Sequence, residues 1–347
     1  MQSGLVSILI PVYNRRNIIE FTINSALNQT YKNYEIIIVD NHSSDGTYEF
    51  LREEYSNREK VKLYQNAVNV GPVNNWKICL QYASGEYIKF LWSDDIIEKD
   101  FLEKTVNILK SNRKIGLVYS NVNWTMYGKH KECVGIKLYV KRIVNLFFGH
   151  QIYKYSSYSI GKSAPYDRSK YLKGIFYKLY DVPVSASCAL FRKKDVVIQD
   201  EIQNDFSVQL YNTGAGIDLL MFLNILSKYE TFYFIDEILC YYGVHDESFS
   251  VSRDLAIEYW IAKKYWLDIT KKEENIPYYN GLINEILKVK KDEEAQIIIQ
   301  RLFQEQKADD FKKYINYNKW EKKYNNYKKK QKYAMFWKIN EDTAFIK

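Results

Sequence analysis

Short apolar runs and helical repeats alternate along the first third of the chain. Five runs of apolar and β-branched residues are too short for helices and are typical of buried strands, at 6–12, 34–40, 61–67, 87–92 and 115–122. Segments with helical apolar spacing or helix-start signals lie between them, at 17–28, 47–55, 72–82 and 100–109. Strands separated by single helices pair in parallel through right-handed crossovers. The pattern therefore predicts an α/β domain with a mainly parallel, Rossmann-like sheet covered by helices on both faces.

The second half of the chain has a less regular pattern. Residues 145–182 are rich in Tyr, Ser, Lys and Gly and have no steady period, so we expect a long surface loop there. Strand-like segments lie on either side of a helix expected at 217–226, and residues 253–307 are predicted to be helical throughout. The expected parts of the chain are 1–125, 126–250 with the long loop, and a helical C-terminal region over 251–347.

Polar or acidic side chains follow four successive strands of the predicted sheet. In strand order they are Pro11, Tyr13 and Asn14, then Asp40, then Asn69 and Gly71, then Asp94 and Asp95. Ligands of open parallel sheets bind beyond the carboxyl ends of the strands. The sequence therefore predicts a ligand site at this edge of the sheet.

The adjacent carboxylates of Asp94 and Asp95 narrow the chemistry of that site. They repel each other unless a cation lies nearby, and an acidic strand end suits a hard divalent ion, Mg²⁺ or Mn²⁺, whose other ligands are phosphate oxygens. The chain has no Walker A sequence and no G-x-G-x-x-G after the first strand, so a glycine loop does not hold the phosphates. Two alternatives stay open: the Asp pair could cap a helix beginning near Ile96, and Asp40 could bond to its own turn.

Several ordered motifs resemble the nucleotide-sugar half of family 2 glycosyltransferases with the GT-A fold. They are PVYN at 11–14, VDNHSSDGT at 39–47, NVG at 69–71, ASGEY at 83–87 and SDD at 93–95. The resemblance covers residues 4–125 and is weak beyond them. One departure stands out, because Trp92 occupies the first acidic position of the family's L-D-x-D-D pattern. Contacts that this carboxylate makes in the family are therefore in doubt here.

The resemblance implies a role for each matching residue. Pro11, Tyr13 and Asn14 would line the nucleobase pocket, Asp40 would accept a base N–H, and Asn69 with Gly71 would border base and ribose. Asp94 and Asp95 would serve the ribose and the metal ion on the diphosphate. His245, in a stretch similar to the family's Tyr-x-x-His-x-x-x-x-Ser, would lie near the metal, although a plain surface or packed histidine is equally compatible with the sequence.

Inverting transfer also requires a base that takes the proton of the acceptor hydroxyl. The resemblance assigns this role to Asp218 at the start of a helix, where Ile217 stands at a position that is often Glu in the family. Asp205 and Asp181 are weaker alternatives, and Asp218 could instead be a helix N-cap.

Charge is concentrated at the C-terminal end of the chain. The formal net charge is +8, and residues 311–347 hold eleven lysines and three acids, so this tail accounts for the whole excess. Lysines interleaved with Tyr and Trp suit a solvated helix or an amphipathic segment on an anionic membrane surface, and less well a single-stranded nucleic acid. Because the first 310 residues are close to neutral, we expect no nucleic-acid partner.

Cysteine usage and the N-terminus bear on the compartment. The four cysteines are far apart and have no zinc spacing, which is typical of reduced thiols in a cytoplasmic protein. The first residues show no basic region before an apolar stretch, and no apolar run reaches the roughly 18–20 residues of a spanning helix. We therefore expect neither a signal peptide nor a membrane span, and a cytoplasmic protein with possible peripheral membrane contact through 311–347.

The sequence thus predicts an inverting, metal-dependent glycosyltransferase. The resemblance implies a nucleoside-diphosphate sugar donor, UDP-linked, and a bacterial surface-polysaccharide or lipid-linked oligosaccharide acceptor, as in lipopolysaccharide or capsule synthesis. Two alternatives remain. The same fold could transfer a polyol phosphate, or the chain could be a catalytically silent module that binds nucleotide sugars.

Overall fold

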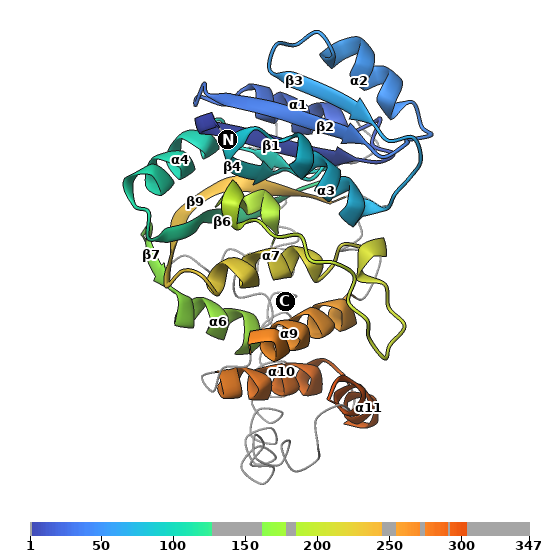
Figure 1. The fold of residues 1–347 in the computed structure, drawn as a ribbon, viewed down its shortest axis with the longest axis vertical. Helices are drawn as coiled ribbons and strands as arrows, with labels where there is room; N and C mark the ends of the chain where they lie inside the picture. Colours follow the sequence, from blue (N-terminus) through green and yellow to red (C-terminus); the bar gives the residue numbers. More distant parts are fainter. Residues whose placement is uncertain are drawn as a thin grey trace, which may run out of the picture. The chain divides into compact units, whose positions relative to one another are not determined.

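The computed structural model describes residues 2–126, 162–177, 185–244, 255–270, 275–290 and 292–303. The chain divides into two compact units, Met1–Thr270 and Lys271–Lys347. The first unit contains the sheet and its helices (Figure 1). In the second unit, the structure describes helices α10 (Ile276–Val289) and α11 (Asp292–Leu302).

The first unit is built on one mixed sheet. Its strand order is β3-β2-β1-β4-β8-β6-β9-β5, and β7 pairs with β9. The strands are β1 (Gln2–Val12), β2 (Tyr34–Asp40), β3 (Val61–Gln65), β4 (Gly85–Phe90), β5 (Ile96–Ile97), β6 (Ile115–Met126), β7 (Ala164–Asp167), β8 (Ala189–Arg192) and β9 (Thr231–Val244). The first four are parallel neighbours, whereas β8 runs antiparallel to both β4 and β6.

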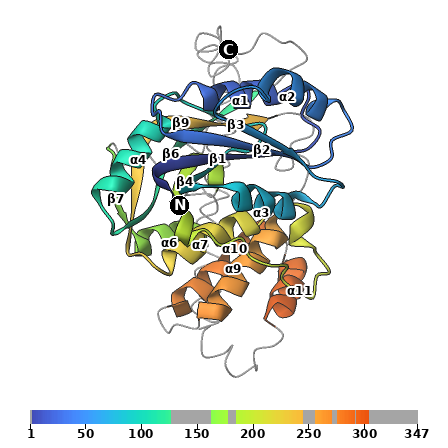
Figure 2. The same ribbon diagram turned by 45° about the horizontal axis from the view of Figure 1, so that its top comes forward.

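Helices cover both faces of this sheet. The described helices of the first unit are α1 (Ile19–Leu27), α2 (Thr47–Tyr55), α3 (Pro72–Tyr82), α4 (Phe101–Ser111), α6 (Arg168–Tyr177), α7 (Ile217–Leu226) and α9 (Ala256–Thr270), of which α9 packs on α7. Figure 2 shows α1 and α2 along one face and α3 and α7 along the other. Coverage on both sides explains why every residue of β2 is buried, although a strand with one wet face would alternate.

The predicted α/β fold is confirmed. The predicted bounds of β2, α2, α3 and α7 match the structure residue for residue. The fifth predicted strand, β6, does not continue the parallel set directly, because the short antiparallel strand β8 lies between β4 and β6. This insertion comes from residues 189–192, far along the sequence, so no local pattern near β6 could show it.

Two other predictions are corrected. The long loop expected over 145–182 is wrong for residues 164–177, which form β7 and α6 and bury Tyr171 and Phe176. The helix expected near Ile96 is absent among these described residues, because Ile96–Ile97 is a strand paired with β9 and α4 begins at Phe101. Residues 127–161 and the tail 311–347 lie outside the described residues.

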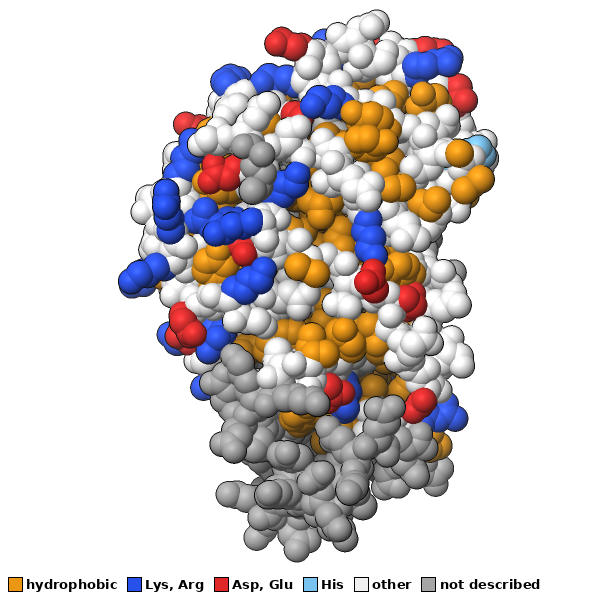
Figure 3. Space-filling model, viewed as in Figure 1, with side chains coloured by type: hydrophobic (Ala, Val, Ile, Leu, Met, Phe, Trp, Pro, Cys, Tyr) orange, Lys and Arg blue, Asp and Glu red, His pale blue; other side chains and the backbone are white. Residues whose placement is uncertain are grey.

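Surface charge is mixed on the face drawn in Figure 3. Lys and Arg side chains lie there with Asp, Glu and apolar side chains between them. In the described part of the chain, no helix is both long enough and apolar enough to cross a membrane.

Candidate active site

The structure brings the four predicted strand ends to one edge of the sheet. Val12 of β1 pairs with Asp40 of β2, and Asp40 pairs with Gln65 of β3. On the other side of β1, Leu9 pairs with Phe90 at the end of β4. Because these neighbours are parallel, their carboxyl ends share one rim, which we call the donor rim. It consists of the residues that directly follow β1, β2, β3 and β4.

Asp40 is a fully buried acid on this rim. Its Oδ2 accepts from the Ser43 backbone N–H at 3.0 Å and from Gln65 Nε2 at 3.1 Å, and its Oδ1 accepts from Ser43 Oγ at 2.5 Å. The two bonds from Ser43 agree with the alternative interpretation, in which Asp40 caps its own turn. The contact of Asp40 with a nucleobase stays a prediction.

Pro11, Tyr13 and Asn14 lie within or directly after β1 and differ in their burial and contacts. Pro11 is buried within the strand opposite Val39, whereas the Tyr13 side chain is 42% exposed. Asn14 has a φ of 51°, a left-handed conformation that Asn tolerates better than most residues. Its backbone N–H donates to Ser43 Oγ at 2.9 Å, and its side chain accepts from Ser44 N–H at 2.9 Å. The loops after β1 and β2 therefore brace each other and leave Tyr13 open on the rim.

A cluster of asparagines shapes the rim after β3. Asn41 donates to Asn69 Oδ1 at 2.8 Å and accepts from Asn66 Nδ2 at 2.9 Å. Asn69 Oδ1 also accepts from the Gly71 N–H at 2.9 Å. Asn75 of α3 donates to the Val39 carbonyl at 3.0 Å and is buried.

The sequence prediction included Asn69 and Gly71 but missed Asn41, Asn66 and Asn75. The asparagines are closely spaced over residues 66–75, and this spacing could have indicated the cluster. A loop without regular structure needs side-chain amides to satisfy its backbone groups.

Asp95 lies at the end of β4 in a different setting. The residue is 4% exposed, and its Oδ1 accepts from the Gly243 N–H of β9 at 3.0 Å. Its Oδ2 is buried and has no hydrogen-bond partner among the described residues. Burial and then the adjacent charge of Asp94 raise the pKa of Asp95 to about 8. Asp94 itself is half-buried.

A buried lysine lies behind this pair. Lys89 of β4 is fully buried, donates to the Ser187 carbonyl and holds its Nζ 4.0 Å from the centre of the Phe101 ring. Burial lowers the pKa of Lys89 to about 8. Lys89 and Asp95 thus place a titratable cation and a titratable anion in one desolvated region at the end of β4.

The Asp pair fits a divalent cation. A buried oxygen without a donor and two adjacent carboxylates are what a hard ion would satisfy, with phosphate oxygens completing its ligands. Among the described residues, no group of three His, Cys, Asp or Glu side chains could hold a metal alone. His245, the third predicted ligand, lies outside the described residues, so its role stays a prediction.

Trp92 replaces a family carboxylate with an aromatic contact. Its backbone N–H donates to Ser187 Oγ at 3.0 Å, and its Nε1 donates to Ser185 Oγ at 3.1 Å. Its ring lies 4.6 Å from that of Trp76 of α3, measured between centroids. Trp92, at the position of the family's first acid, thus connects the end of β4 to α3 and to the segment before β8.

Asp218 lies in the first turn of α7. The N-cap of that helix is Gly216, so the alternative of Asp218 as N-cap is wrong, although its Oδ1 does accept from the Leu219 N–H at 2.7 Å. Its Oδ2 accepts from the Tyr259 hydroxyl of α9 at 3.2 Å. Burial raises the pKa of Asp218 to about 7. Of the two weaker alternatives, Asp205 is exposed in the loop before α7, and Asp181 lies outside the described residues.

The family model described as glycosyl transferase family 2 matches residues 7–175. Residues 7–175 belong to this family. The match includes the whole donor rim, the Asp pair and the strand β7 that returns to the sheet.

Curated bacterial relatives agree over the same region. An uncharacterised glycosyltransferase of Haemophilus influenzae is 39% identical over 115 residues, which is 33% of this chain and 46% of the relative. The Escherichia coli UDP-Glc:alpha-D-GlcNAc-diphosphoundecaprenol beta-1,3-glucosyltransferase WfgD is 39% identical over 121 residues, 35% of this chain and 47% of its own. The putative teichuronic acid biosynthesis glycosyltransferase TuaG of Bacillus subtilis is 38% identical over 105 residues, 30% and 42%. The chain thus spans less than half the length of these relatives.

Solved structures show the same fold over a longer stretch. Staphylococcus aureus TarS 1–349 is similar with a TM-score of 0.56 and 17% identity, covering 86% of this chain and 80% of TarS 1–349. Its complex with UDP-GlcNAc has a TM-score of 0.53 and 15% identity, with 85% and 84% covered. Because 86% of this chain is covered, the likeness in fold extends beyond residue 175.

Proposed function

We propose that this chain transfers a sugar from a UDP-linked donor to a hydroxyl of a surface-polysaccharide or lipid-linked oligosaccharide acceptor, with inversion at the anomeric carbon. The observation that carries the proposal is the buried Oδ2 of Asp95, which has no hydrogen-bond partner within the described ranges and lies next to Asp94 on the donor rim of a family 2 domain. The names of two similar proteins support the donor class, since WfgD is described as using UDP-Glc and TarS is solved with UDP-GlcNAc.

The donor would lie along the rim. Tyr13 and Asn14 after β1 and Asn69 with Gly71 after β3 would border the base and ribose. Asp94 and Asp95 would hold Mg²⁺ or Mn²⁺ with His245, and this ion, when bound, neutralises the diphosphate leaving group. Hydrogen bonds within and between the loops after β1, β2 and β3 already hold these loops in place, so we expect binding to require little reordering.

Asp218 would take the proton from the acceptor hydroxyl. A pKa near 7 leaves a large share of the carboxylate ionised at neutral pH while keeping it basic enough to accept a proton, which suits a general base. The Tyr259 hydroxyl bonds to Oδ2 and fixes the orientation of the carboxylate. The acceptor oxygen then displaces the diphosphate in one step, and the new bond forms on the face opposite the bond that breaks.

A panel of nucleotide sugars tests this function. We expect metal-dependent release of UDP from one UDP-sugar, and a product whose anomeric configuration, measured by NMR, is opposite to that of the donor. Retention of configuration would contradict the single displacement. Binding of UDP-sugars with no UDP release under any acceptor or metal condition would favour the silent module. Release of CMP from a CDP-linked polyol, with the polyol phosphate passed to the acceptor, would favour the phosphate transferase.

We also propose that the protein acts in the cytoplasm and contacts the inner face of the membrane through residues 311–347. The support is the excess of lysine over acid in this tail and its interleaved aromatics. Flotation with vesicles of anionic lipid should retain the full chain and lose a chain that ends at residue 310. Equal flotation of both would remove the membrane proposal and leave the transferase proposal intact.

A further inference from the structure

One loop leads from β8 to the candidate base. Residues 196–216 follow the 3₁₀ turn Lys193–Asp195 and end at the first turn of α7, which carries Asp218. We call this segment the base loop. It packs against two residues of α3, Trp76 and Lys77, and against the helix N-cap, Gly71.

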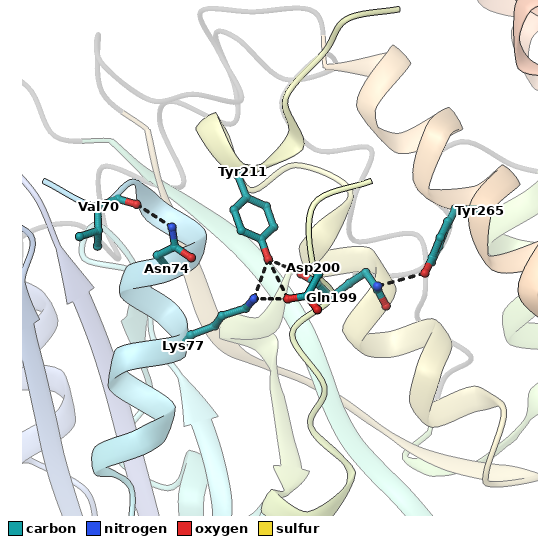
Figure 4. A network of polar contacts seen from close by, with 7 residues as sticks. All are labelled: Val70, Asn74, Lys77, Gln199, Asp200, Tyr211 and Tyr265. Carbon is teal, nitrogen blue, oxygen red and sulfur yellow. Dashed lines mark hydrogen bonds and ion pairs between the residues drawn. The ribbon is translucent and has the colours of Figure 1, made fainter. Parts of the chain in front are cut away.

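The first contact is a lysine that joins two parts of the base loop. Lys77 Nζ donates to Asp200 Oδ1 and to the Tyr211 hydroxyl, both at 2.6 Å (Figure 4). The Tyr211 hydroxyl donates in turn to the Gln199 carbonyl at 2.9 Å. Lys77 Nζ also lies 5.1 Å from the centre of the Tyr211 ring, within the range of a cation–π contact. One ammonium group thus holds the beginning and the end of the base loop on the same helix.

The other two contacts are close approaches of backbone. A Cβ atom on Gly214 would lie 2.2 Å from a ring carbon of Trp76, so the Gly214 backbone rests directly on that ring. The Tyr211 carbonyl oxygen is 3.8 Å from the Cβ position of Gly71. Gly71 is the N-cap of α3, and its carbonyl accepts from Asn41 of the asparagine cluster at 3.3 Å. The helix that supports the base loop therefore begins inside the donor rim.

The base loop is braced on its other side as well. The Glu201 carboxylate accepts from the Leu210 and Tyr211 N–H groups, both at 3.1 Å. Gln199 Nε2 donates to the Tyr265 hydroxyl of α9 at 3.0 Å (Figure 4). Gly214 and Gly216 both have positive φ, 77° and 80°, just before Asp218. Glycine adopts these angles without steric cost, so the two residues let the chain turn from the base loop directly into the first turn of α7.

Stability alone does not account for the Lys77 contacts. Its side chain is 29% exposed and that of Asp200 is 88% exposed, and such an ion pair contributes little to folding. The contacts instead hold the base loop in one position on α3, and so connect the helix at the donor rim to the segment that ends at the candidate base.

We propose that Lys77 and Tyr211 are positioning residues that hold the base loop on α3 and so set the Asp218 carboxylate relative to the donor. This inference rests on the proposed transferase function. The proposed mechanism gives neither residue a contact with a reacting atom. Their effect is expected on turnover and not on nucleotide affinity, since misplacement by about 1 Å can cost on the order of a hundredfold in rate.

A matched pair elsewhere in the first unit provides the control. Lys110 Nζ donates to the Tyr31 hydroxyl at 3.2 Å and lies 5.4 Å from its ring centre, and the Tyr31 hydroxyl donates to the Gly4 carbonyl at 2.5 Å. This pair repeats the lysine–tyrosine–carbonyl arrangement, but it lies near the amino end of β1, away from the donor rim.

The experiment compares Lys77→Met and Tyr211→Phe with Lys110→Met and Tyr31→Phe. Each full-length variant is assayed for UDP release from the UDP-sugar that the wild type turns over, with Mn²⁺, and for its Kd for UDP. We expect kcat to fall about tenfold or more in the first two and to stay within twofold in the controls, while Kd for UDP stays within twofold in all four. Lys77→Arg, which keeps charge and donors, should recover most of the rate.

Hydrogen exchange supplies a readout that does not need turnover. Peptides within 196–216 should exchange faster in Lys77→Met than in the wild type, and not in Lys110→Met. Unchanged exchange, an equal loss of kcat in both lysine variants, or a loss of UDP affinity that parallels the loss of kcat would each overturn the inference. A wild type that releases no UDP from any UDP-sugar would instead overturn the proposed function, and with it the catalytic part of this inference.

Discussion

The ends of β2 and β4 carry two buried acids with opposite surroundings. Asp40 after β2 receives three hydrogen bonds from Ser43 and Gln65, all from its own neighbourhood on the rim. Asp95 after β4 accepts from the Gly243 N–H, and its buried Oδ2 has no hydrogen-bond partner in the part of the chain that the structure describes. Burying a carboxylate is costly unless donors or a cation compensate it. An acid at a strand end therefore does not by itself mark a metal site, and the missing donor separates Asp95 from Asp40.

The largest effect is expected at Asp95. Asp95→Asn keeps a side-chain oxygen for the Gly243 N–H but removes the charge that a divalent ion needs. Turnover should fall by roughly a thousandfold, because a metal ion supplies several kcal/mol of charge stabilisation in the transition state. Thermal unfolding with UDP and Mn²⁺ should lose the metal-dependent stabilisation, about 2.7 kcal/mol for the wild type at 100 Kd. A variant that keeps the full Mn²⁺-dependent shift would place the ion elsewhere.

The next effect is expected at Asp218, which resembles Asp95 in its raised pKa but has donors on both oxygens. Asp218→Asn should lower kcat by about a hundredfold or more, as loss of a general base does, and should keep the thermal shift with UDP and Mn²⁺. Full activity in this variant would show that another group takes the acceptor proton.

The same substitution gives a prediction for stability. Because the folded-state pKa of Asp218 is about 7 and thus above the unfolded value, this group favours the folded state at low pH, and that contribution is lost as the pH rises toward 7. Between about pH 4 and 7, the wild type should therefore lose free energy of unfolding that the Asp218→Asn variant does not lose. Urea titrations at three pH values measure the difference, and parallel curves would contradict the pKa assignment.

A third and smaller effect is expected at Asp40. Asp40→Asn places an amide group where Ser43 and Gln65 donate, so the free energy of unfolding should fall by about 1–3 kcal/mol. If Asp40 also accepts a base N–H, as the family resemblance implies, the affinity for UDP should fall about tenfold. A destabilised variant with unchanged UDP affinity would show that Asp40 stabilises its turn and does not bind the base, and would thus separate its role further from that of Asp95.

The smallest effect is expected at Tyr259. Tyr259→Phe removes the hydroxyl that donates to Asp218 Oδ2, and this bond favours the ionised carboxylate. The acidic limb of the kcat–pH profile should move to higher pH by a fraction of a unit, with little change in kcat at its plateau. A profile identical to that of the wild type would separate this tyrosine from the base.

Much of the donor half could be predicted from the sequence, because local patterns there report on local structure. Apolar runs bounded by turns gave β2, and Pro72 after Gly71 gave the start of α3. The partners of the asparagines were not predictable to the same degree, since Asn41 and Asn69 bond across two different loops. The loop predicted at 145–182 failed over 164–177 because β7 and α6 owe their order to β9 and to the buried Tyr171, not to a local period.

The sequence by itself determined the order of strands and helices around the donor rim and the acidic ending of β4, since both depend on residues that are neighbours along the chain. Only the tertiary structure decided that β8 enters the sheet antiparallel between β4 and β6 and that α3 supports the loop leading to Asp218. It also decided that both carboxylate oxygens of Asp40 accept hydrogen bonds, while Asp95 Oδ2 accepts none from a described residue. These facts depend on contacts between residues tens to more than a hundred positions apart. Burial and donor supply at each acid are set by those contacts, and no local pattern encodes them.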